Sequence, residues 1–275
     1  MTIGTGTGGT GTDGTGTGGA GRTAVVTGSS SGIGQAATAR LLAAGWSVAG
    51  LDVNAEDTGG WANGFQGIRC DVGDADSVGR AFARVGSPLH AVICCAGVLR
   101  TGPLDSVAIE DFDLVMRVNL RGTFLCAQKA LPALQASAVP DAPTRIVLLS
   151  SIAALRPKVS GGVYAASKAA VSQLCRVMAA EWAPKGVLVN AIAPGTVDTP
   201  MVRAVSNPNA ASGYRPSGVS PVGRIAQPDD IVDLMMFLLS DGARYMAGTT
   251  IPVDGGTQAA FIPPGVVSDA PLGGA

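Results

Sequence analysis

The sequence feature that most constrains the fold is a short apolar run followed at once by a glycine-rich turn and a helical pattern. Thr23 to Val26 is rich in β-branched residues, which predicts a strand. The turn reads Thr-Gly-Ser-Ser-Ser-Gly-Ile-Gly over residues 27–34, and the helical pattern of residues 35–44 is closed by Gly45. Such a turn lets the backbone approach a pyrophosphate, which then lies at the positive N-terminus of the helix. The alternative is an ordinary glycine-rich turn, and the flanking strand and helix favour phosphate binding.

An aspartate at the end of the next predicted strand indicates which dinucleotide the turn would bind. The strand runs from Ser47 to Leu51 and ends in Asp52, where a carboxylate can accept hydrogen bonds from ribose hydroxyls. The same carboxylate would repel a 2′-phosphate, and residues 29, 30, 53 and 54 are all uncharged. The sequence therefore predicts NAD as the cofactor, with a surface aspartate as the alternative.

Strand and helix patterns continue to alternate along the chain. Further strands are predicted at residues 65–69, 90–94, 146–149, 187–192 and 249–253, and further helices at residues 74–85, 110–134, 162–182 and 228–239. Such alternation is typical of a parallel sheet covered by helices. We therefore predict an α/β fold, a single-domain Rossmann-type doubly wound parallel sheet of about seven strands with helices on both faces.

The two ends of the chain differ in composition from this domain, which we place at residues 22–258. Residues 1–21 are almost entirely Gly and Thr and hold ten of the 39 glycines, so they are predicted to be a disordered tail. Residues 259–275 form a C-terminal tail with Phe261 and Ile262, which could contact another subunit.

Composition excludes several classes of function. The net charge of −1 offers no basic surface for nucleic acid. No run reaches the 18 or so apolar residues that a membrane span needs, and the best candidate, Ile231 to Leu239, contains Asp233. The start of the chain has neither the basic region nor the apolar run of a secretory signal. Five cysteines without regular spacing predict reduced thiols in a cytoplasmic enzyme, and no Cys or His spacing fits a metal site.

A tyrosine and a lysine in the predicted helix 162–182 are candidates for proton transfer. Tyr164 and Lys168 are four residues apart, which places both side chains on one helix face, about 5–6 Å apart at Cβ. The ammonium group would favour the phenolate, and such a tyrosine can exchange a proton with a reacting oxygen. Ser151, thirteen residues earlier, could hydrogen-bond the same oxygen. Taken alone, the Tyr-x-x-x-Lys pattern is more often an ordinary amphipathic helix.

The order of the motifs resembles the short-chain dehydrogenase/reductase family, in its single-domain branch. The resemblance covers about residues 22–258 and depends on motifs that are weak singly but specific in this order and at these distances. They are Thr27-Gly28-x-x-x-Gly32-Ile33-Gly34, Asp71-Val72, Ala96-Gly97, Asn119, Ser151, Tyr164-x-x-x-Lys168, Pro194-Gly195 and Val253-Asp254-Gly255-Gly256.

The resemblance implies a role for each of four polar residues. Tyr164 would be the general acid/base, and Lys168 would support it and bind the nicotinamide ribose. Ser151 would polarise the substrate oxygen, while its neighbour Ser150 would be structural. Asn119 would kink its helix and hold a water that relays protons to Lys168.

The resemblance also implies a set of NAD contacts. The pyrophosphate, the adenosine and the nicotinamide would each be held by a different group of residues. These are Gly28, Ser31, Gly32, Ile33 and Gly34 for the pyrophosphate; Asp52, Asp71 and Val72 for the adenosine; and Ala96, Gly97, Tyr164, Lys168, Pro194, Gly195, Val197 and Thr199 toward the nicotinamide.

One motif departs from the family. Cys94-Cys95-Ala96-Gly97 stands where Asn-Asn-Ala-Gly is usual, and the thiol of Cys95 cannot replace the amide hydrogen bonds that tie this strand to a neighbour. Two small buried residues are the favoured interpretation over a strained redox disulfide.

Several other polar or soft side chains are predicted to have structural roles. His90 is expected to be a hydrogen-bonded structural histidine, and residues 235–237 (Met-Met-Phe) are expected in the core. Residues 195–223 correspond to a mobile lid over the substrate in the family. Its Arg203 and Arg215 could meet an acidic substrate, although solvated loop charges are the favoured interpretation.

These observations together predict an NAD-dependent oxidoreductase that interconverts a secondary alcohol and a ketone, with Tyr164 as general acid/base. The pocket walls, residues 155–163 and 196–222, favour a mostly uncharged, cyclic or aromatic alcohol. A non-catalytic NAD-binding sensor and a sugar-nucleotide epimerase or dehydratase remain alternatives. Apolar faces on the predicted helices 110–134 and 162–182 predict a homo-oligomer, a tetramer or dimer.

Overall fold

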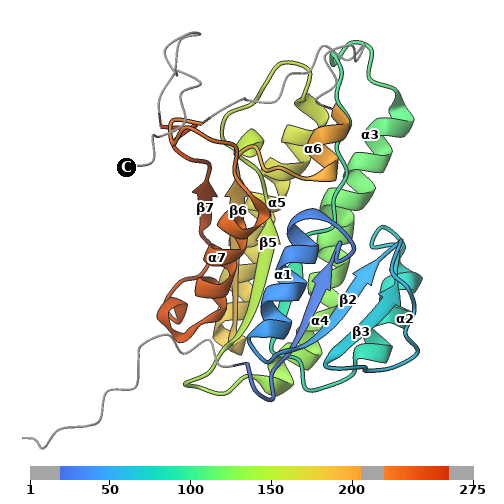
Figure 1. Ribbon diagram of the computed structural model, residues 1–275, viewed down its shortest axis with the longest axis vertical. Helices are drawn as coiled ribbons and strands as arrows, with labels where there is room; N and C mark the ends of the chain where they lie inside the picture. The colour runs from blue at the N-terminus through green and yellow to red at the C-terminus, as the bar shows by residue number, and fades with distance from the viewer. Residues whose placement is uncertain (1–18, 206–219, 260–275) are drawn as a thin grey trace, which may run out of the picture.

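A seven-stranded parallel sheet organises the chain. The computed structural model describes residues 19–205 and 220–259 of the 275 (Figure 1). The sheet order is β3-β2-β1-β4-β5-β6-β7, and every pair of neighbours is parallel. The strands are β1 (Thr23–Thr27), β2 (Ser47–Asp52), β3 (Phe65–Arg69), β4 (Ala91–Cys94), β5 (Thr144–Leu149), β6 (Val187–Pro194) and β7 (Thr250–Val253). The predicted fold class is confirmed.

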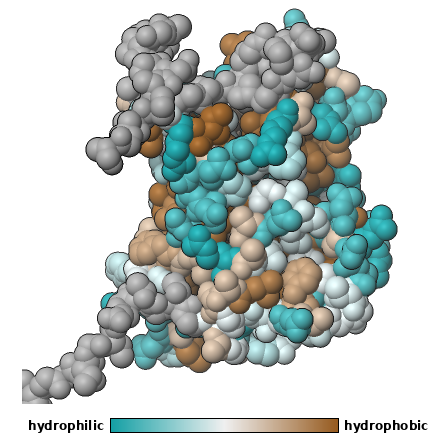
Figure 2. Space-filling view, viewed as in Figure 1, coloured by the Kyte–Doolittle hydropathy of each residue, from teal (hydrophilic) through white to brown (hydrophobic). Residues whose placement is uncertain are grey.

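Helices cover both faces of this sheet, and a separate apolar core lies under each layer. Helices α1 (Gly32–Ala43) and α7 (Pro228–Leu239) lie together on the face turned to the viewer in Figure 1. Patches of hydrophilic residues mark the outer surface in the same view (Figure 2), and Arg40 of α1 forms ion pairs with Asp229 and Asp233 of α7. Helices α2 (Ala75–Val85), α4 (Thr123–Ser137) and α5 (Gly162–Trp182) pack on the opposite face. The central strands β1, β4, β5 and β6 are therefore buried on both sides, whereas the edge strand β7 is only partly buried.

The strand order reverses between β1 and β4, and this reversal fixes where a ligand can bind. The chain runs outward from β1 through β2 to β3, then returns to β4 on the other side of β1. Loops after the two diverging strands separate, which leaves a crevice at their carboxyl ends.

The helix predicted at residues 110–134 is not a uniform α-helix. It consists of α3 (Ile109–Val115), a π-helical segment η1 (Met116–Gly122) and α4. Asn119 lies in the middle of η1, so the predicted kink at this residue takes the form of a wider helical turn. A short helix α6 (Pro200–Val205), absent from the prediction, interrupts the region expected to be a loop.

Ordered packing begins before Arg22, the first residue of the predicted domain. The amide of Gly19 donates to the carbonyl of Ala44 at 2.9 Å, and the Arg22 amide donates to Gly19 at 2.8 Å. Gly19 lies against the indole of Trp46, where an added Cβ would clash. The remaining tail residues, 1–18 and 260–275, lie outside the described residues. None of the described helices is long and apolar enough to span a membrane.

Candidate functional site

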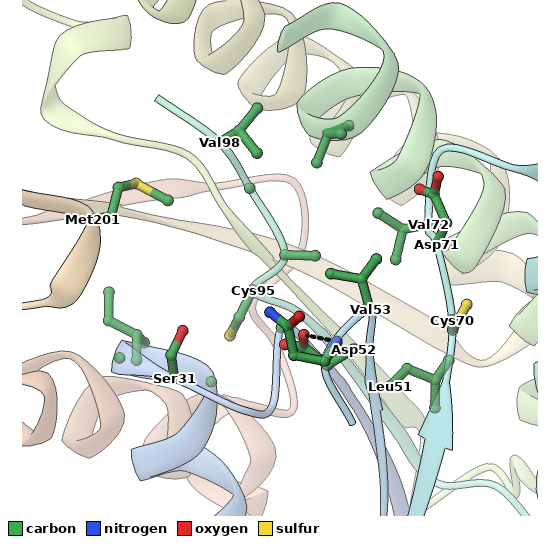
Figure 3. A pocket seen from close by; sticks show the side chains of 18 of the residues that line it. Ser31, Leu51, Asp52, Val53, Cys70, Asp71, Val72, Cys95, Val98 and Met201 are labelled. Atoms are coloured by element: carbon green, nitrogen blue, oxygen red, sulfur yellow. Dashed lines mark hydrogen bonds between the residues drawn. The ribbon is translucent and has the colours of Figure 1, made fainter. Parts of the chain in front are cut away.

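A cavity of about 460 Å³ lies at the carboxyl ends of the strands where the sheet order reverses (Figure 3). Asp52 and Asp71 face it from the ends of β2 and β3, and Met201 approaches from α6 on the opposite side. Most of the predicted cofactor contacts line it: Gly28, Ser31, Gly32, Ile33, Gly34, Asp52, Asp71, Val72, Ala96, Gly97 and Thr199. The structure therefore brings together residues that are up to 171 positions apart in sequence, from Gly28 to Thr199.

The glycine-rich turn forms a wall of bare backbone. Gly28 has a φ of +69°, and a Cβ there would lie 2.8 Å from the Ala96 nitrogen. A Cβ on Gly34 would clash with the carbonyl of Gly28, so the start of α1 packs directly on the turn. Ser31, the N-cap of α1, makes no side-chain capping bond and faces the cavity. Exposed amides at a helix N-terminus suit a pyrophosphate, so the residues present fit a nicotinamide dinucleotide.

The Asp52 carboxylate is held in place at the end of β2. It accepts a hydrogen bond from the Ser30 amide at 3.2 Å and another from the Asn54 amide at 2.9 Å. Its register partner on β3, Arg69, donates from Nε to the carbonyl of Val53 at 3.1 Å. The sequence prediction overlooked Arg69, since it lies near Asp52 only through strand pairing.

Asp71 pairs with a cation that the sequence analysis missed. Arg117, in the π-helical segment, donates to the Asp71 carboxylate at 2.7 Å and also lines the cavity. Burial raises the pKa of Asp71, but hydrogen bonds from Arg117 and the Gly73 amide outweigh it and hold the pKa below its ordinary value. The ion pair between Arg117 and Asp71 fixes the cavity wall beside Val72, where the adenine is predicted to bind.

Lys168 is almost completely buried behind the cavity. Its side chain points toward the end of β5, where Nζ donates to the carbonyl of Leu149 at 2.7 Å. The same nitrogen lies 5.7 Å from the ring centroid of Tyr164, as the i, i+4 spacing predicts. Burial lowers the pKa of Lys168 to about 8. A Cβ on Gly97 would stand only 3.6 Å from this ammonium, so the glycine leaves room beside it.

Asn119 positions the loop after β4. Its side-chain oxygen accepts from the Val98 amide at 2.8 Å, and its nitrogen donates to the Val98 carbonyl and to Ser167 at 3.0 and 3.1 Å. The side chain is fully buried, and these bonds tie η1 to both the loop and α5. Its predicted role in a proton relay to Lys168 stays a prediction.

Ser151 and Tyr164 line a second, smaller cavity of about 80 Å³. The Ser151 hydroxyl accepts from the Ala153 amide at 3.2 Å, which caps a short 3₁₀ helix, η2 (Ile152–Ala154). Ser150 points elsewhere: its hydroxyl donates to the carbonyl of Lys168 and contacts the Ser172 hydroxyl at 2.7 Å. Ser151 thus lies at the cavity and Ser150 lies away from it, and the roles given to them stay predictions.

The segment after β6 reaches both cavities. Thr199 lines the larger one, where its methyl group would lie 3.2 Å from a Cβ on Gly32, and Gly195 lines the smaller one. Three predicted cofactor contacts, Lys168 among them, belong to neither lining. Pro194 ends β6, and Val197 is buried and bridged to Ala226.

The two adjacent cysteines are free thiols. Burial raises the pKa of Cys94 to about 12 and raises that of Cys95 as well, so both stay protonated near neutral pH. Beside them, the Ala96 amide donates to the Thr27 hydroxyl at 3.1 Å, which ties the end of β4 to β1. Of the two residues expected to be buried, Cys94 is buried and Cys95 is partly exposed, and the redox disulfide stays an untested alternative.

The side chains assigned structural roles are placed mostly as predicted. His90 accepts a hydrogen bond from the Thr23 amide at 3.0 Å, and Arg203 forms an exposed ion pair with Asp198. Met235 and Met236 are buried, but Phe237 is exposed, which corrects its assignment to the core. Arg215 lies outside the described residues. Within those residues, no group of three His, Cys, Asp or Glu side chains could hold a metal ion.

Replacing Lys168 by Met should stabilise the cofactor-free protein at pH 7. The pKa of this amine is lowered from 10.5, so the ammonium disfavours folding fully below pH 8, and this penalty fades as the pH rises toward 10.5. We expect the variant to melt a few degrees above wild type at pH 7, with the difference shrinking by pH 10. Scanning calorimetry at both pH values tests this, with the exposed Lys185→Met as a control. A lower melting temperature than wild type at pH 7 would contradict it.

Known proteins resemble this chain both in sequence and in structure. Residues 28–258 match the family described as enoyl-(acyl carrier protein) reductase. The chain is 36% identical over 251 residues to cis-4-hydroxycyclohexanecarboxylate dehydrogenase of Sinomonas cyclohexanicum, covering 86% of this chain and 97% of that protein. It is 34% identical to 3-oxoacyl-(acyl-carrier-protein) reductase of Mycobacterium tuberculosis, covering 86% and 92%. The ligand-free structure of Thermoplasma acidophilum aldohexose dehydrogenase matches with a TM-score of 0.77 and 27% identity, covering 87% of this chain and 95% of that one.

Proposed function

Since the chain belongs to the short-chain dehydrogenase/reductase family, we propose that it is an NAD-dependent oxidoreductase that interconverts a secondary alcohol and a ketone. The observation that carries this proposal is that helix α5 places Tyr164 in the smaller cavity and Lys168 next to Gly97, which lines the larger one. Tyr164 and Ser151 face the smaller cavity, while Lys168 lies behind the loop that lines the larger one. A substrate oxygen in the smaller cavity would lie beside the dinucleotide position.

Each polar side chain then has one task. A bound nicotinamide supplies the hydride acceptor or donor. Tyr164 takes the hydroxyl proton during oxidation and returns it during reduction, and Ser151 holds the same oxygen by a hydrogen bond. Lys168 favours the phenolate of Tyr164 through its charge. Its ammonium is fixed by the Leu149 carbonyl, so it keeps this position without a ligand.

The choice of NAD is supported by the arrangement around Asp52. The carboxylate is fixed by two backbone amides and lines the cavity, so it can accept hydrogen bonds from ribose hydroxyls. Arg117 is the one cation in the described lining, and its charge is already paired with Asp71. A 2′-phosphate beside Asp52 would therefore meet a like charge.

Two rivals are less well supported. A cofactor-binding sensor needs no reacting group, yet all four polar residues of the family's catalytic set are present, and Ser151 and Tyr164 share one cavity. A sugar-nucleotide epimerase or dehydratase usually has a glycine spacing other than that of Gly28, Gly32 and Gly34.

A panel of alcohols and ketones, followed by NADH absorbance, tests the proposed activity. The panel should span cyclic secondary alcohols, including cis-4-hydroxycyclohexanecarboxylate, linear polyols and 3-oxoacyl thioesters, because these represent the substrates named for the relatives. Oxidation or reduction of at least one compound is expected. Tight NADH binding without turnover on the whole panel would favour the sensor.

We further propose that the protein is a homo-oligomer, a dimer or tetramer built on α4 and α5. Phe124 on α4 and Val177 on α5 are exposed apolar side chains on these two helices, which lie on the same face of the sheet. Light scattering at micromolar concentration is expected to give at least twice the 27.3 kDa mass of one chain. A monomer peak would contradict the proposal.

A further inference from the structure

Two cations line the smaller cavity together with Ser151 and Tyr164. Arg156 and Lys158 belong to the segment that joins η2 to α5, and this segment forms one wall of the cavity. From these walls the sequence analysis predicted a mostly uncharged substrate, and these two cationic side chains count against that prediction. The path of the segment between η2 and α5 places them at the cavity, and the spacing of residues in the sequence does not reveal that path.

The charge of this lining is unbalanced. Among the described residues that form it, Arg156 and Lys158 are cationic and none is Asp or Glu. The remainder are small, apolar or hydroxyl-bearing: Leu99, Ser151, Ile152, Ala153, Gly161, Tyr164, Gly195, Thr196, Met201, Val202 and Val205. The described lining therefore carries two positive charges and no negative one, beside apolar side chains.

The guanidinium group of Arg156 is oriented by an uncharged hydrogen-bond partner. Its Nη1 donates to the backbone carbonyl of Thr257 at 2.8 Å, so a neutral acceptor from the far end of the chain fixes its direction. Arg203 on the nearby helix α6 differs, because its charge is paired with Asp198 and it lies outside the lining. Arg156 can therefore give its remaining N–H groups to a ligand.

Lys158 stands close enough to Arg156 for the two charges to repel. Burial lowers the pKa of Lys158, and the charge of Arg156 lowers it further. Arg156 is exposed and Lys158 is partly buried, and an anion between these two like charges would lessen their repulsion.

We propose that Arg156 and Lys158 bind a carboxylate on the substrate, so that the enzyme acts on hydroxycarboxylic or ketocarboxylic acids. The inference rests on the proposed function for the position of the reacting oxygen. The carboxylate contacts the two cations while the carbinol oxygen contacts Ser151 and Tyr164, so the two groups lie at different ends of a compact substrate. This replaces the uncharged alcohol that the sequence analysis favoured.

Matched substrates test the charge directly. The pair is cis-4-hydroxycyclohexanecarboxylate and its methyl ester, which present the same carbinol carbon with and without the negative charge. We expect Arg156→Gln and Lys158→Gln each to lower kcat/KM for the acid about tenfold to a hundredfold, mainly through KM, and to change the ester less than about threefold. Arg203→Gln removes the same charge outside the lining and should leave both substrates unchanged.

A binding measurement separates this inference from the proposed activity. Calorimetric titration of the NADH-loaded protein with cyclohexanecarboxylate, against neutral cyclohexanecarboxamide, needs no turnover. Preferred binding of the carboxylate, lost in Arg156→Gln or Lys158→Gln but kept in Arg203→Gln, supports the inference even if no alcohol is oxidised. Equal binding of the two compounds overturns it, and so does competition by coenzyme A alone, which would point to a phosphate ligand. Turnover of neutral alcohols without carboxylate preference would leave the proposed function intact.

Discussion

Replacing Tyr164 by Phe is expected to lower kcat by 10²–10⁴-fold, the typical loss when a general acid/base is removed. The substitution removes only the hydroxyl, so the ring can still pack in α5. No neighbour can take over the proton transfer, because the Lys168 ammonium donates to the Leu149 carbonyl and Ser151 caps η2 through its hydroxyl oxygen. The larger cavity is untouched by the change.

Two measurements make this result specific. NADH titration by fluorescence should give a dissociation constant within about threefold of wild type, because the phenol hydroxyl is not part of the described lining of the larger cavity. Tyr245→Phe is the matched control, since Tyr245 is fully exposed and lies in neither cavity of the site. Turnover of Tyr164→Phe within about tenfold of wild type would overturn the assignment.

The second large effect concerns the cofactor. We expect kcat/KM with NAD to exceed that with NADP by at least about a hundredfold, equivalent to about 2.7 kcal/mol. The 2′-phosphate carries nearly two negative charges, and the fixed carboxylate of Asp52 stands where that group would bind. With NAD, the same carboxylate accepts hydrogen bonds from the ribose instead.

Substitutions at the end of β2 should change this preference in steps. Asp52→Ala removes the repulsion and should lower the ratio of kcat/KM with NAD to kcat/KM with NADP. The double variant with Val53→Arg should lower this ratio further by adding a cation. Arg69 would add a second cation near the 2′-phosphate, because its Nε donates to the Val53 carbonyl at the same edge of the sheet. Steady-state kinetics with both cofactors checks each step. Similar kcat/KM values for NAD and NADP in the unmodified protein would contradict the role given to Asp52.

Much of the fold could be predicted because its elements are marked locally. The predicted bounds of Phe65–Arg69, Gly162–Trp182 and Pro228–Leu239 coincide with β3, α5 and α7. Proline begins α7 and glycine begins α5, and continuous apolar runs mark the central strands β1, β4 and β5. The glycine-rich turn was recognisable because its residues are consecutive.

The missed features depend on contacts between distant segments. Arg117 reaches Asp71 across 46 positions, and Arg156 reaches Thr257 across 101. Gly19 was assigned to a tail by composition, yet Trp46 provides a surface for it. Helix α6 is only six residues long, in a stretch rich in Gly, Pro and Ser, so its local signal is weak.

The π-helical turn has a consequence for how this segment can change in evolution. Each residue of an α-helix rotates the chain by about 100°, so a single inserted or deleted residue turns everything beyond it by that angle. Val115, just before the turn, is fully buried, and Thr123, just after it, is buried as well. Deleting one residue between them would restore a regular helix but rotate one of these two anchors out of the core. A point substitution at the exposed Arg121 of the π-helical segment would not rotate the helix that follows. We therefore expect the number of residues in this segment to vary far less in evolution than their identities.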